Sequence, residues 1–503
     1  MSELERPGRW RHIAALALVI ALAGLASPYG PRPAAAATNR TIASWSLSGS
    51  PFAGDIPPLP TAVRAHLSLS RSARVTVALF NSAGTRVLRL ARRADLAAGE
   101  YDWAWDGRDA RGAEMADGIY RLRVRVVNGR GVATASRPLR KGLPPIYPAN
   151  PAAIVVVVDP GHGGRNPGAE YNGYAEKDFN LDIGLALQQL LEHAGVTVLM
   201  TRTTDTAVNE PISDINGDGL ANDYDDPAAR NDIANLARAD LDIHVHNNAY
   251  GCRCARGTEM YTSWKRSWSP QGIDLATLIQ REQIFTLDQF TAGAYFPRDR
   301  GVSNGRYYYM APYSVVCPTA EQGSGCSPPY LPRPVLMPSV LAESLFVNND
   351  IELELLKRSD VRIALAAAFY VGIAEWLNTR EYGSAYELAD GPAGGVTAGE
   401  AISYSIRVTN RGNTASDGWR LELRHVAAAP LYDGSPDPGT LLGQAAVPDG
   451  LLPGESVQVS VDATAPAVAG DWLVKTDIRL VDDTSFALMG IPALQVPLTT
   501  TAP

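Results

Sequence analysis

The sequence of 503 residues has no excess of basic residues, because its 45 Lys and Arg are outnumbered by 53 Asp and Glu. Proteins that bind nucleic acids usually present a basic surface, so the formal net charge of −8 disfavours nucleic acid as a partner. The sequence also lacks a segment with the high charge and low hydrophobicity of a disordered tail. Its length exceeds what one hydrophobic core supports, and we expect about three folded domains.

A stable membrane span is not expected either. The apolar stretch at 13–26 is too short to cross a bilayer comfortably, follows three arginines and precedes small residues at 34–37. We therefore interpret residues 1–37 as a signal peptide that directs export to the cell envelope or the exterior. An uncleaved membrane anchor is the alternative, which the prolines after the apolar stretch disfavour. No cysteine lies directly after the stretch, so a lipid anchor is not expected.

Cysteine is scarce, and the four residues present are Cys252, Cys254, Cys317 and Cys326. An even number of cysteines in an exported protein favours disulfides. Because one residue separates Cys252 from Cys254, we expect each of them to bridge to one of the later two and to join two long loops. A structural zinc ion on four thiolates is an alternative, although the usual paired two-residue gaps are missing. Free thiols are the third alternative.

The region 43–143 has the period-two alternation of a β-sandwich, with turn signals at 81–84 and 128–129 between the alternating runs. Its motifs at 105–109 and 117–120 resemble the Ig-like domain of the flagellar hook-capping protein. This resemblance implies a scaffold or attachment module without chemistry of its own.

The region 388–499 alternates again at 402–408 and 457–461, with a turn at 410–413. It is similar to Ig-like modules that occur in secreted hydrolases. We therefore expect a second β-sandwich at this end of the chain.

Residues 152–380, which follow a proline-rich linker, have the rhythm of an α/β domain. The β-branched run at 154–158 is typical of a strand buried on both faces of a parallel sheet. Apolar residues at helical spacing follow, Gly195 ends that helix, and the next strand is predicted at 196–200. Further helices are predicted at 228–238, 273–290 and 350–379, and further strands at 241–245, 306–310 and 340–343. The predicted fold class is an α/β domain with a mostly parallel central sheet and helices on both faces, flanked by two Ig-like β-sandwiches.

Four chemically suitable side chains fall at one edge of this predicted sheet. His162 follows the first strand on a glycine-rich turn, and Glu176 opens the first long helix. His246 and Glu343 lie at the ends of two later strands, and ligands gather beyond the carboxyl ends of parallel strands. A hydrolytic zinc ion needs three nitrogen or oxygen ligands, an open position and a carboxylate that accepts the proton of water. The set therefore predicts a catalytic zinc ion.

Each of these residues taken alone has an ordinary explanation. A histidine after a strand is commonly a surface group, and a glutamate in a first helical turn is favoured by the helix dipole. Only the combination with the glycine-rich turn favours zinc. His244 lies two residues before His246 and points to the same face of the strand, and we assign His246 as the ligand. His244, Asn248 and Asp159 are expected to support the ligands or to face the substrate.

These residues belong to a series of motifs that run in order along the central region. The series comprises Val158-Asp159-Pro160-Gly161-His162-Gly163-Gly164, the segment 176–181, Thr201-Arg202 with Asp205, Arg230, the segments 246–249 and 300–302, and Glu343 with Phe346 and Asn348. It resembles the zinc-dependent N-acetylmuramoyl-L-alanine amidases of type 3. The resemblance implies that His162, Glu176 and His246 bind zinc and that Glu343 is catalytic.

The same resemblance implies hydrolysis of the amide bond between the lactyl group of N-acetylmuramic acid and L-alanine in peptidoglycan. Zinc would lower the pKa of its water towards about 7 and polarise the carbonyl, while Glu343 accepts the water proton and returns it to the leaving amine. A wall-binding or adhesion protein on an inactive amidase fold and a zinc peptidase acting on another amide are the alternatives. Besides peptidoglycan, wall polymers or envelope proteins are expected partners of the flanking sandwiches.

The sequence departs from the family at His244, where a small residue is usual, and by long insertions around 209–227 and 248–334. The first insertion has oxygen-bearing residues at positions 1, 3, 5, 9 and 12 of a calcium loop, with Gly219 at position 6. The predicted calcium ligands are Asp214, Asn216, Asp218, Asn222 and Asp225. At position 12 an aspartate replaces the usual glutamate. We expect a structural calcium ion, and a solvated acidic turn is the alternative.

Overall fold

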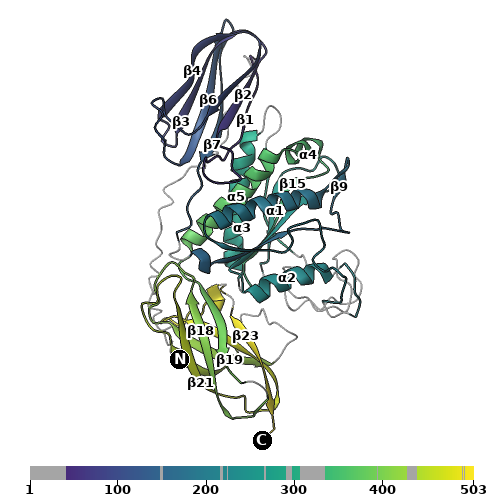
Figure 1. The fold of residues 1–503 in the computed structure, drawn as a ribbon, viewed down its shortest axis with the longest axis vertical. Helices are drawn as coiled ribbons and strands as arrows, with labels where there is room; N and C mark the ends of the chain where they lie inside the picture. Colours follow the sequence, from purple (N-terminus) through teal and green to yellow (C-terminus); the bar gives the residue numbers. More distant parts are fainter. Residues whose placement is uncertain are drawn as a thin grey trace, which may run out of the picture.

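Three bodies follow one another along the long axis of the molecule, with the α/β domain between two β-sandwiches (Figure 1). The computed structural model describes residues 41–147, 151–215, 219–223, 225–264, 268–290, 297–305, 335–392, 395–427, 439–489, 491 and 493–502. The predicted signal peptide and the strand predicted at 306–310 lie outside these residues. Within them, no helix has both the length and the apolar character that crossing a membrane requires.

The N-terminal domain is a sandwich of two antiparallel sheets. One sheet consists of β1 (Ile42–Ser48), β2 (Val63–Leu69) and β5 (Gly99–Trp105). The other has the order β4-β3-β6-β7 and consists of β3 (Ala73–Asn81), β4 (Arg86–Leu96), β6 (Gly118–Asn128) and β7 (Gly131–Lys141). Alternate residues of β3 and β6 are buried between the sheets, among them Val75, Val77, Leu79, Leu122 and Val124. The apolar residues recur at every second position because these are the side chains that point into the core between the two sheets.

The central domain is built on a six-stranded sheet with the order β11-β8-β12-β15-β13-β14. Its strands are β8 (Val155–Pro160), β11 (Thr197–Met200), β12 (Leu241–Asn248), β13 (Thr258–Thr262), β14 (Asp299–Asn304) and β15 (Ser339–Phe346). Four of the five pairings are parallel, and only β13 runs antiparallel to β15. The mostly parallel sheet is confirmed. Strands β13 and β14 were not predicted, because both lie in a long insertion that is rich in polar residues.

Helices cover both faces of this sheet, as predicted. The helices α1 (Glu176–His193), α3 (Ser269–Phe290) and α5 (Ser359–Thr379) pack on one face, where Val156 and Val158 contact their apolar residues. The helix α2 (Asp225–Ala237) lies on the other face, where Val157 packs with Ala234. Strand β8 is therefore buried on both sides, which explains its continuous β-branched run. The short elements of the domain are η1 (Pro151–Ala153), β9 (Glu170–Tyr171), β10 (Tyr174–Ala175) and α4 (Asp350–Leu356).

The C-terminal domain is a second sandwich with its own core. Its first sheet has the order β16-β18-β21, from β16 (Ser384–Asp390), β18 (Ala401–Asn410) and β21 (Ser456–Thr464). Its second sheet has the order β17-β23-β22-β19-β20, from β17 (Val396–Thr397), β19 (Arg420–Ala427), β20 (Thr440–Ala446), β22 (Gly470–Arg479) and β23 (Leu494–Thr501), and the 3-10 turn η3 (Ala487–Met489) precedes β23. Tyr404 and Trp419 are among its largest buried side chains.

Buried charged groups join the flanking domains to the central one. Arg140 of β7 donates to Glu282 of α3 across 2.6 Å, and both side chains are largely buried. At the other end, Asp240 accepts from Arg380 at 3.2 Å and from Arg411 of the C-terminal domain at 2.8 Å. Buried pairs of this kind resist separation because breaking one leaves an unpaired charge. The contacts therefore hold the three domains in one arrangement.

Candidate metal centre

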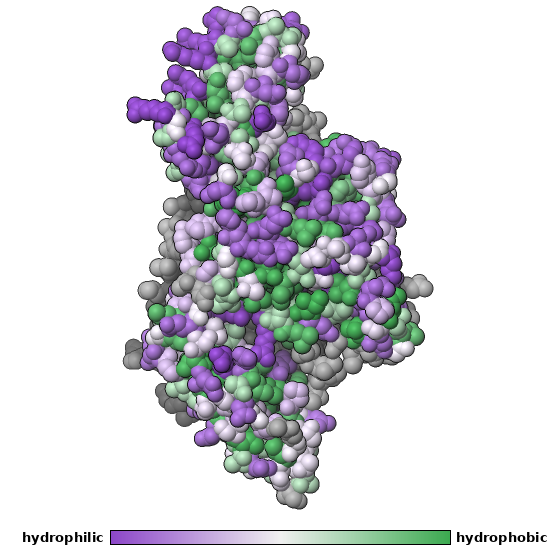
Figure 2. Space-filling view, in the orientation of Figure 1, coloured by the Kyte–Doolittle hydropathy of each residue, from purple (hydrophilic) through white to green (hydrophobic). Residues whose placement is uncertain are grey.

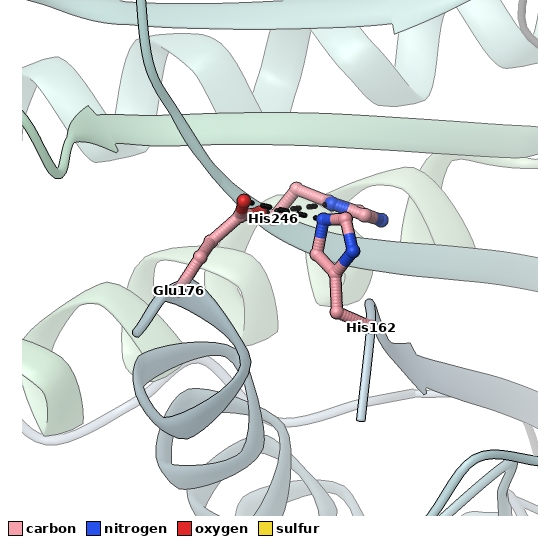
Figure 3. Close-up of side chains that lie close together, drawn as sticks. All are labelled: His162, Glu176 and His246. Atoms are coloured by element: carbon pink, nitrogen blue, oxygen red, sulfur yellow. Dashed lines mark hydrogen bonds and ion pairs between the residues drawn. The ribbon is translucent and has the colours of Figure 1, made fainter. Parts of the chain in front are cut away.

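Three predicted ligands meet at the carboxyl edge of the central sheet (Figure 3). One ligand atom from each of His162, Glu176 and His246 lies within 4.8 Å of the other two. The His162 Nε2 is 3.2 Å from the Glu176 Oε2, and the His246 Nδ1 is 3.0 Å from the Glu176 Oε1. The two imidazole rings meet edge to face at a centroid distance of 4.9 Å. No second group of this composition occurs in the part of the chain that the structure describes.

Each predicted ligand comes from the element that the sequence predicted for it. His162 follows β8 on the glycine turn, Glu176 is the first residue of α1, and His246 lies near the end of β12. Two glycines permit the close approach of these elements. A Cβ on Gly161 would lie 2.1 Å from the His246 Nε2, and a Cβ on Gly168 would lie 2.6 Å from the Glu176 Oε2. Larger residues at these positions would displace the ligands.

Two buried arginines fix the backbone of the turn that carries His162. The Arg202 Nε donates to the carbonyl of Pro160 at 2.8 Å and its Nη2 to that of Gly161 at 3.0 Å. The Arg230 Nη1 donates to the same Pro160 carbonyl at 2.9 Å, and its Nη2 to that of His162 at 2.6 Å. His162 has a φ of 61°, a conformation that non-glycine residues adopt rarely and at a cost. The arginines supply the surroundings that hold it there.

Glu176 is held by more than the two histidines. Its Oε2 accepts from the backbone N–H of Ala169 at 3.0 Å, and its Oε1 from that of Asn247 at 3.1 Å. The Asn180 side chain, one helical turn later, donates to the same Oε1 at 3.1 Å. Burial alone would raise the pKa of Glu176, but hydrogen bonds from the two imidazoles lower it well below its usual range. The group is therefore a fixed anion at neutral pH.

Asn180 and Arg202 are supporting residues to which the sequence analysis gave no role. Asn180 also donates to the carbonyl of Gly161 at 3.2 Å and so connects the helix to the turn that carries His162. Its position four residues after Glu176 places both side chains on one face of α1. That spacing is a signal by which the sequence identifies Asn180 as a neighbour of the ligand. Arg202 has no comparable signal, since it donates only to backbone carbonyls, and those of Pro160, Gly161 and Lys177 are distant in sequence.

His244 is buried, with only 1% of its surface exposed, which favours the first of its two predicted roles, support of the ligands, over contact with the substrate. Its Nδ1 lies 2.7 Å from the Asp159 Oδ2 and its Nε2 lies 2.8 Å from the Asp242 Oδ2. Burial opposes protonation, but the charge of Asp242 and the hydrogen bond to Asp159 raise the pKa of His244 to about 10. Two residues along a strand are about 7 Å, which leaves His244 below the open edge where His246 lies.

The other two residues expected to support the site differ in position. Asp159 is fully buried, where it pairs with Arg230 and accepts from Thr201 and His244. These partners outweigh burial and lower the pKa of Asp159 far below its usual value. Asn248 is the last residue of β12, and its backbone carbonyl accepts from Val347 at 2.8 Å. Its contact with substrate stays a prediction.

Glu343 lies in β15 directly beside His246, since the two residues are register partners in neighbouring parallel strands. Its Oε2 is buried and has no hydrogen-bond partner. Burial raises the pKa of Glu343 well above its ordinary value, and the carboxylates of Glu176 and Glu259 add to this rise. Glu259 faces it from β13 and is itself paired with Arg300 at 2.9 Å. Glu343 is therefore an unpaired carboxyl group at the edge of the ligand cluster.

The residues present fit a zinc ion. Two imidazoles and one carboxylate are a common set of protein ligands at hydrolytic zinc. The His162 Nε2 and the His246 Nδ1 each face one oxygen of Glu176, so one donor atom from each of the three residues converges on a common point. The His162 Nδ1 lies 3.0 Å from the Asn166 Oδ1, so this ring has the outer partner that metal-binding histidines typically have.

Part of the predicted calcium loop is described. Asn216 and Asp218 lie outside the described residues. Asp225 opens α2, and its two oxygens accept from the backbone N–H groups of Ile215 and Asn222, each at 2.8 Å. Asp214 accepts from Gly219 at 2.9 Å. These carboxylates bind backbone amides of their own loop, and calcium stays a prediction.

The expected disulfide pattern is wrong for the first two cysteines. Cys252 is bonded to Cys254, with a Cα–Cα distance of 5.1 Å. The chain turns tightly after β12, and this turn brings the two thiols together although one residue separates them. Cys317 and Cys326 lie outside the described residues. The disulfide therefore closes a small loop downstream of His246 instead of joining two long ones.

Comparison with known proteins identifies the central domain. Residues 156–375 match the model of the N-acetylmuramoyl-L-alanine amidase family, and residues 61–130 match that of the FlgD Ig-like domain. The chain is 30% identical over 246 residues to an endolysin of Bacillus phage SPP1, an alignment that covers 48% of this chain and 74% of the endolysin. The chain belongs to the N-acetylmuramoyl-L-alanine amidase family.

Other similar proteins align with nearly the same share of this amidase. It is 28% identical over 229 residues to the N-acetylmuramoyl-L-alanine amidase CwlM of Bacillus licheniformis, covering 45% of this chain and 69% of CwlM. Among solved structures, the amidase AmiC2 of Nostoc punctiforme is 24% identical with a TM-score of 0.33, covering 45% of this chain and 97% of AmiC2. The family resemblance inferred from the motifs is confirmed, as is that of the N-terminal sandwich.

The close contact between Gly161 and His246 yields a test of the centre. We expect Gly161→Ala to weaken zinc binding by about 10–100-fold, the usual effect of disturbing the surroundings of a metal ligand, because the added Cβ displaces the imidazole. Competition with a chelator of known affinity measures the change. Gly251→Ala, where nothing lies within 4 Å of the added Cβ, is the matched control. Unchanged zinc affinity in a folded Gly161→Ala amidase would contradict the assignment.

Proposed function

We propose that His162, Glu176 and His246 hold one zinc ion and that Glu343 is the acid–base group of the amidase reaction. Family membership makes the chain an N-acetylmuramoyl-L-alanine amidase, which hydrolyses the amide bond between the lactyl group of N-acetylmuramic acid and L-alanine in peptidoglycan. The observation that carries the finer assignment is the His–Glu–His group, in which Glu176 and His246 are buried and His162 is half-buried, with an unpaired glutamate beside it. A bound zinc ion would supply water activation and polarisation of the scissile carbonyl.

The role of Glu343 follows from its position and its lack of partners. The pairing of β12 with β15 holds it beside His246, and its Oε2 makes no hydrogen bond that proton transfer would have to break. A general base must lie within hydrogen-bond reach of the proton that it removes. From this position Glu343 takes a proton from the attacking water and passes it to the leaving amine of L-alanine.

The remaining residues of the site hold this geometry before substrate arrives. Asn180 and two backbone amides fix Glu176, and Arg202 and Arg230 fix the turn of His162. Their donors are already aligned, so little reorganisation is required during the reaction. Such preorganisation of charged groups is a major source of catalysis in enzymes.

Replacement of the proposed acid–base group tests whether hydrolysis can be lost while metal binding is kept. We expect Glu343→Gln to keep its zinc but to lose activity by roughly 10²–10⁴-fold, because the amide cannot accept the proton. The measurement is the release of free stem peptides from purified peptidoglycan, followed by mass spectrometry, together with zinc content. Glu354→Gln, an exposed carboxylate in α4, removes the same charge away from the site and should leave activity unchanged.

The same products distinguish the alternative functions. An active amidase gives stem peptides that begin with a free L-alanine amine, and a zinc chelator should abolish their release. A peptidase acting on another amide would give different fragments, and an inactive wall-binding protein would give none with or without zinc. Release of stem peptides by Glu343→Gln at the rate of the unaltered amidase would refute the role of this residue.

Export to the cell envelope or the exterior is part of the proposal, because peptidoglycan lies outside the cytoplasm. It is supported by the arginines, apolar stretch and small residues of the segment 1–37. We expect the amidase recovered from the culture medium or envelope of a producing cell to begin close after residue 37. N-terminal sequencing tests this, and a mature chain that retains the apolar stretch would instead support an uncleaved anchor.

A structural calcium ion in the loop 214–225 is also proposed, on the spacing of oxygen-bearing residues alone. We expect calorimetric titration to find uptake of one calcium ion and Asp214→Asn to weaken it, because this carboxylate holds position 1. Asp223→Asn makes the same charge change at a position of the loop that supplies no ligand, and it serves as the control. Absence of calcium uptake by the unaltered chain would leave a solvated acidic turn.

A further inference from the structure

Charge is distributed very unevenly over this chain. Residues 41–147 contain 16 Lys and Arg but only 8 Asp and Glu, a formal charge of +8 in a protein whose total is −8. The rest of the chain therefore carries a formal charge of −16. The N-terminal sandwich is thus a basic module attached to an acidic enzyme, and its basic residues are not spread evenly over its surface.

The arginines gather on the outer face of the four-stranded sheet. The pairing of β3 with its neighbours places Phe80 between Arg86 and Arg121, and Ala78 between Arg89 and Arg123. Thr76 lies opposite Arg125 in the next row. The intervening residues of β3 and β6 are buried in the core, so these side chains point outward. We call this surface the basic face and define it by Arg86, Arg89, Arg121, Arg123 and Arg125.

The charges of the basic face are not neutralised by the protein. Among the described residues, none of the five arginines forms an ion pair, and four of the five are exposed, Arg121 being half-buried. The one acidic residue of the strands β3, β4 and β6 is Asp95, which is already paired with Arg74 at 2.9 Å. The charge of Arg86 lowers the pKa of Arg89, and partial desolvation, Arg92 and Arg93 lower it further. Like charges are therefore held together here without a counter-charge.

The basic face has the shape of a strip. Arginines of β4 form one edge and those of β6 the other, and the two edges are about 10 Å apart because β3 lies between them. The floor between them consists of Thr76 and Ala78, which are small. Phe80 is covered by the Arg123 guanidinium at 4.3 Å from the ring centre. Figure 2 shows hydrophilic side chains along the side of this domain where Figure 1 places β3 and β4.

We propose that the basic face binds a linear anionic polymer with phosphodiester charges, which lies along β3 between the two rows of arginines. Successive arginines on one face of β6 are about 7 Å apart, so a chain with charges at regular intervals can contact several of them at once. Guanidinium groups suit phosphate because they donate in a fixed fork. An anionic membrane is a poorer fit, since membrane-surface binding commonly adds exposed apolar anchors and the one aromatic ring here is covered.

This binding site is separate from the metal centre and does not depend on the proposed chemistry. It lies in another domain, built on strands that contribute no residue to the ligand cluster. Its function would be to concentrate the amidase on a phosphate-bearing polymer at the cell surface. The sequence analysis expected the flanking sandwiches to contact wall polymers in general. The proposal names the residues of one sandwich that would do so and the chemistry of the polymer that they would bind.

The test uses the full chain and poly(glycerol phosphate) as the probe. We expect binding that weakens steeply as salt rises from low to moderate concentration, because exposed charges are screened. Arg89→Gln, Arg123→Gln and Arg125→Gln combined should lower the affinity by about tenfold or more at low salt, in line with the loss of several phosphate contacts. The combined change Arg64→Gln, Arg71→Gln and Arg111→Gln, which alters exposed arginines outside the basic face, is the charge-matched control and should lower affinity by less than about twofold.

Both triple variants should hydrolyse soluble muropeptides and unfold thermally as the unaltered chain does. These two measurements verify that the variants are folded. Equal weakening by both triple variants would overturn the proposal, because it would show an effect of net charge alone. Tighter binding to phosphatidylglycerol vesicles or to single-stranded DNA than to the polymer would also overturn it in favour of another polyanion. Absence of binding to poly(glycerol phosphate) at low salt by the unaltered chain would do the same.

Discussion

The carboxylate of Glu176, buried between two imidazoles, is the interaction on which the rest of the site depends. A buried anion is costly unless it is fully hydrogen-bonded, and Glu176 meets this requirement with both histidines, Asn180 and two backbone amides. These partners fix both of its oxygens, so the ring nitrogens of His162 and His246 converge beside them. A cation between the three groups would meet a fixed negative charge in surroundings of low dielectric constant, without movement of the side chains.

A second buried network lies beneath the first and positions it. Asp159 at the end of β8 pairs with Arg230 and His244, and His244 reaches Asp242 on its other side. Arg230 also donates to the carbonyl of His162, so the network is connected to a proposed metal ligand. Loss of one partner from a buried pair typically costs about 3–5 kcal/mol, which makes these charges mutually dependent. His244 thus supports the turn after β8 through Asp159, which agrees with the supporting role that the sequence analysis gave as one of its two alternatives.

The sequence predicts those parts of the fold in which one local pattern determines the outcome. Strand β8 is identified by its β-branched run and α1 by its apolar spacing, and both position ligands as expected. Strands β13 and β14 escape prediction because they lie in a long insertion rich in polar residues and do not alternate clearly between buried and exposed positions. The burial of His244 depends on where strand β12 ends, and the Cys252–Cys254 disulfide depends on how the loop after that strand turns. The period of the sequence identifies which face of a strand a residue lies on, but it gives neither the end of the strand nor the path of the loop.

The joined domains combine charged interactions that differ in how strongly salt weakens them. The similarity to known amidases covers 156–375, so the arrangement of the flanking sandwiches depends on contacts of this chain itself. Ala53 and Leu59 of the N-terminal sandwich pack into the central core, and the Arg140–Glu282 pair beside them is largely shielded from solvent. Salt screens exposed charges strongly and buried pairs much less. Rising ionic strength should therefore release a polymer from the basic face while the sandwich stays docked on the catalytic domain. Retention at the wall and the integrity of the enzyme are, on this argument, controlled by different charges.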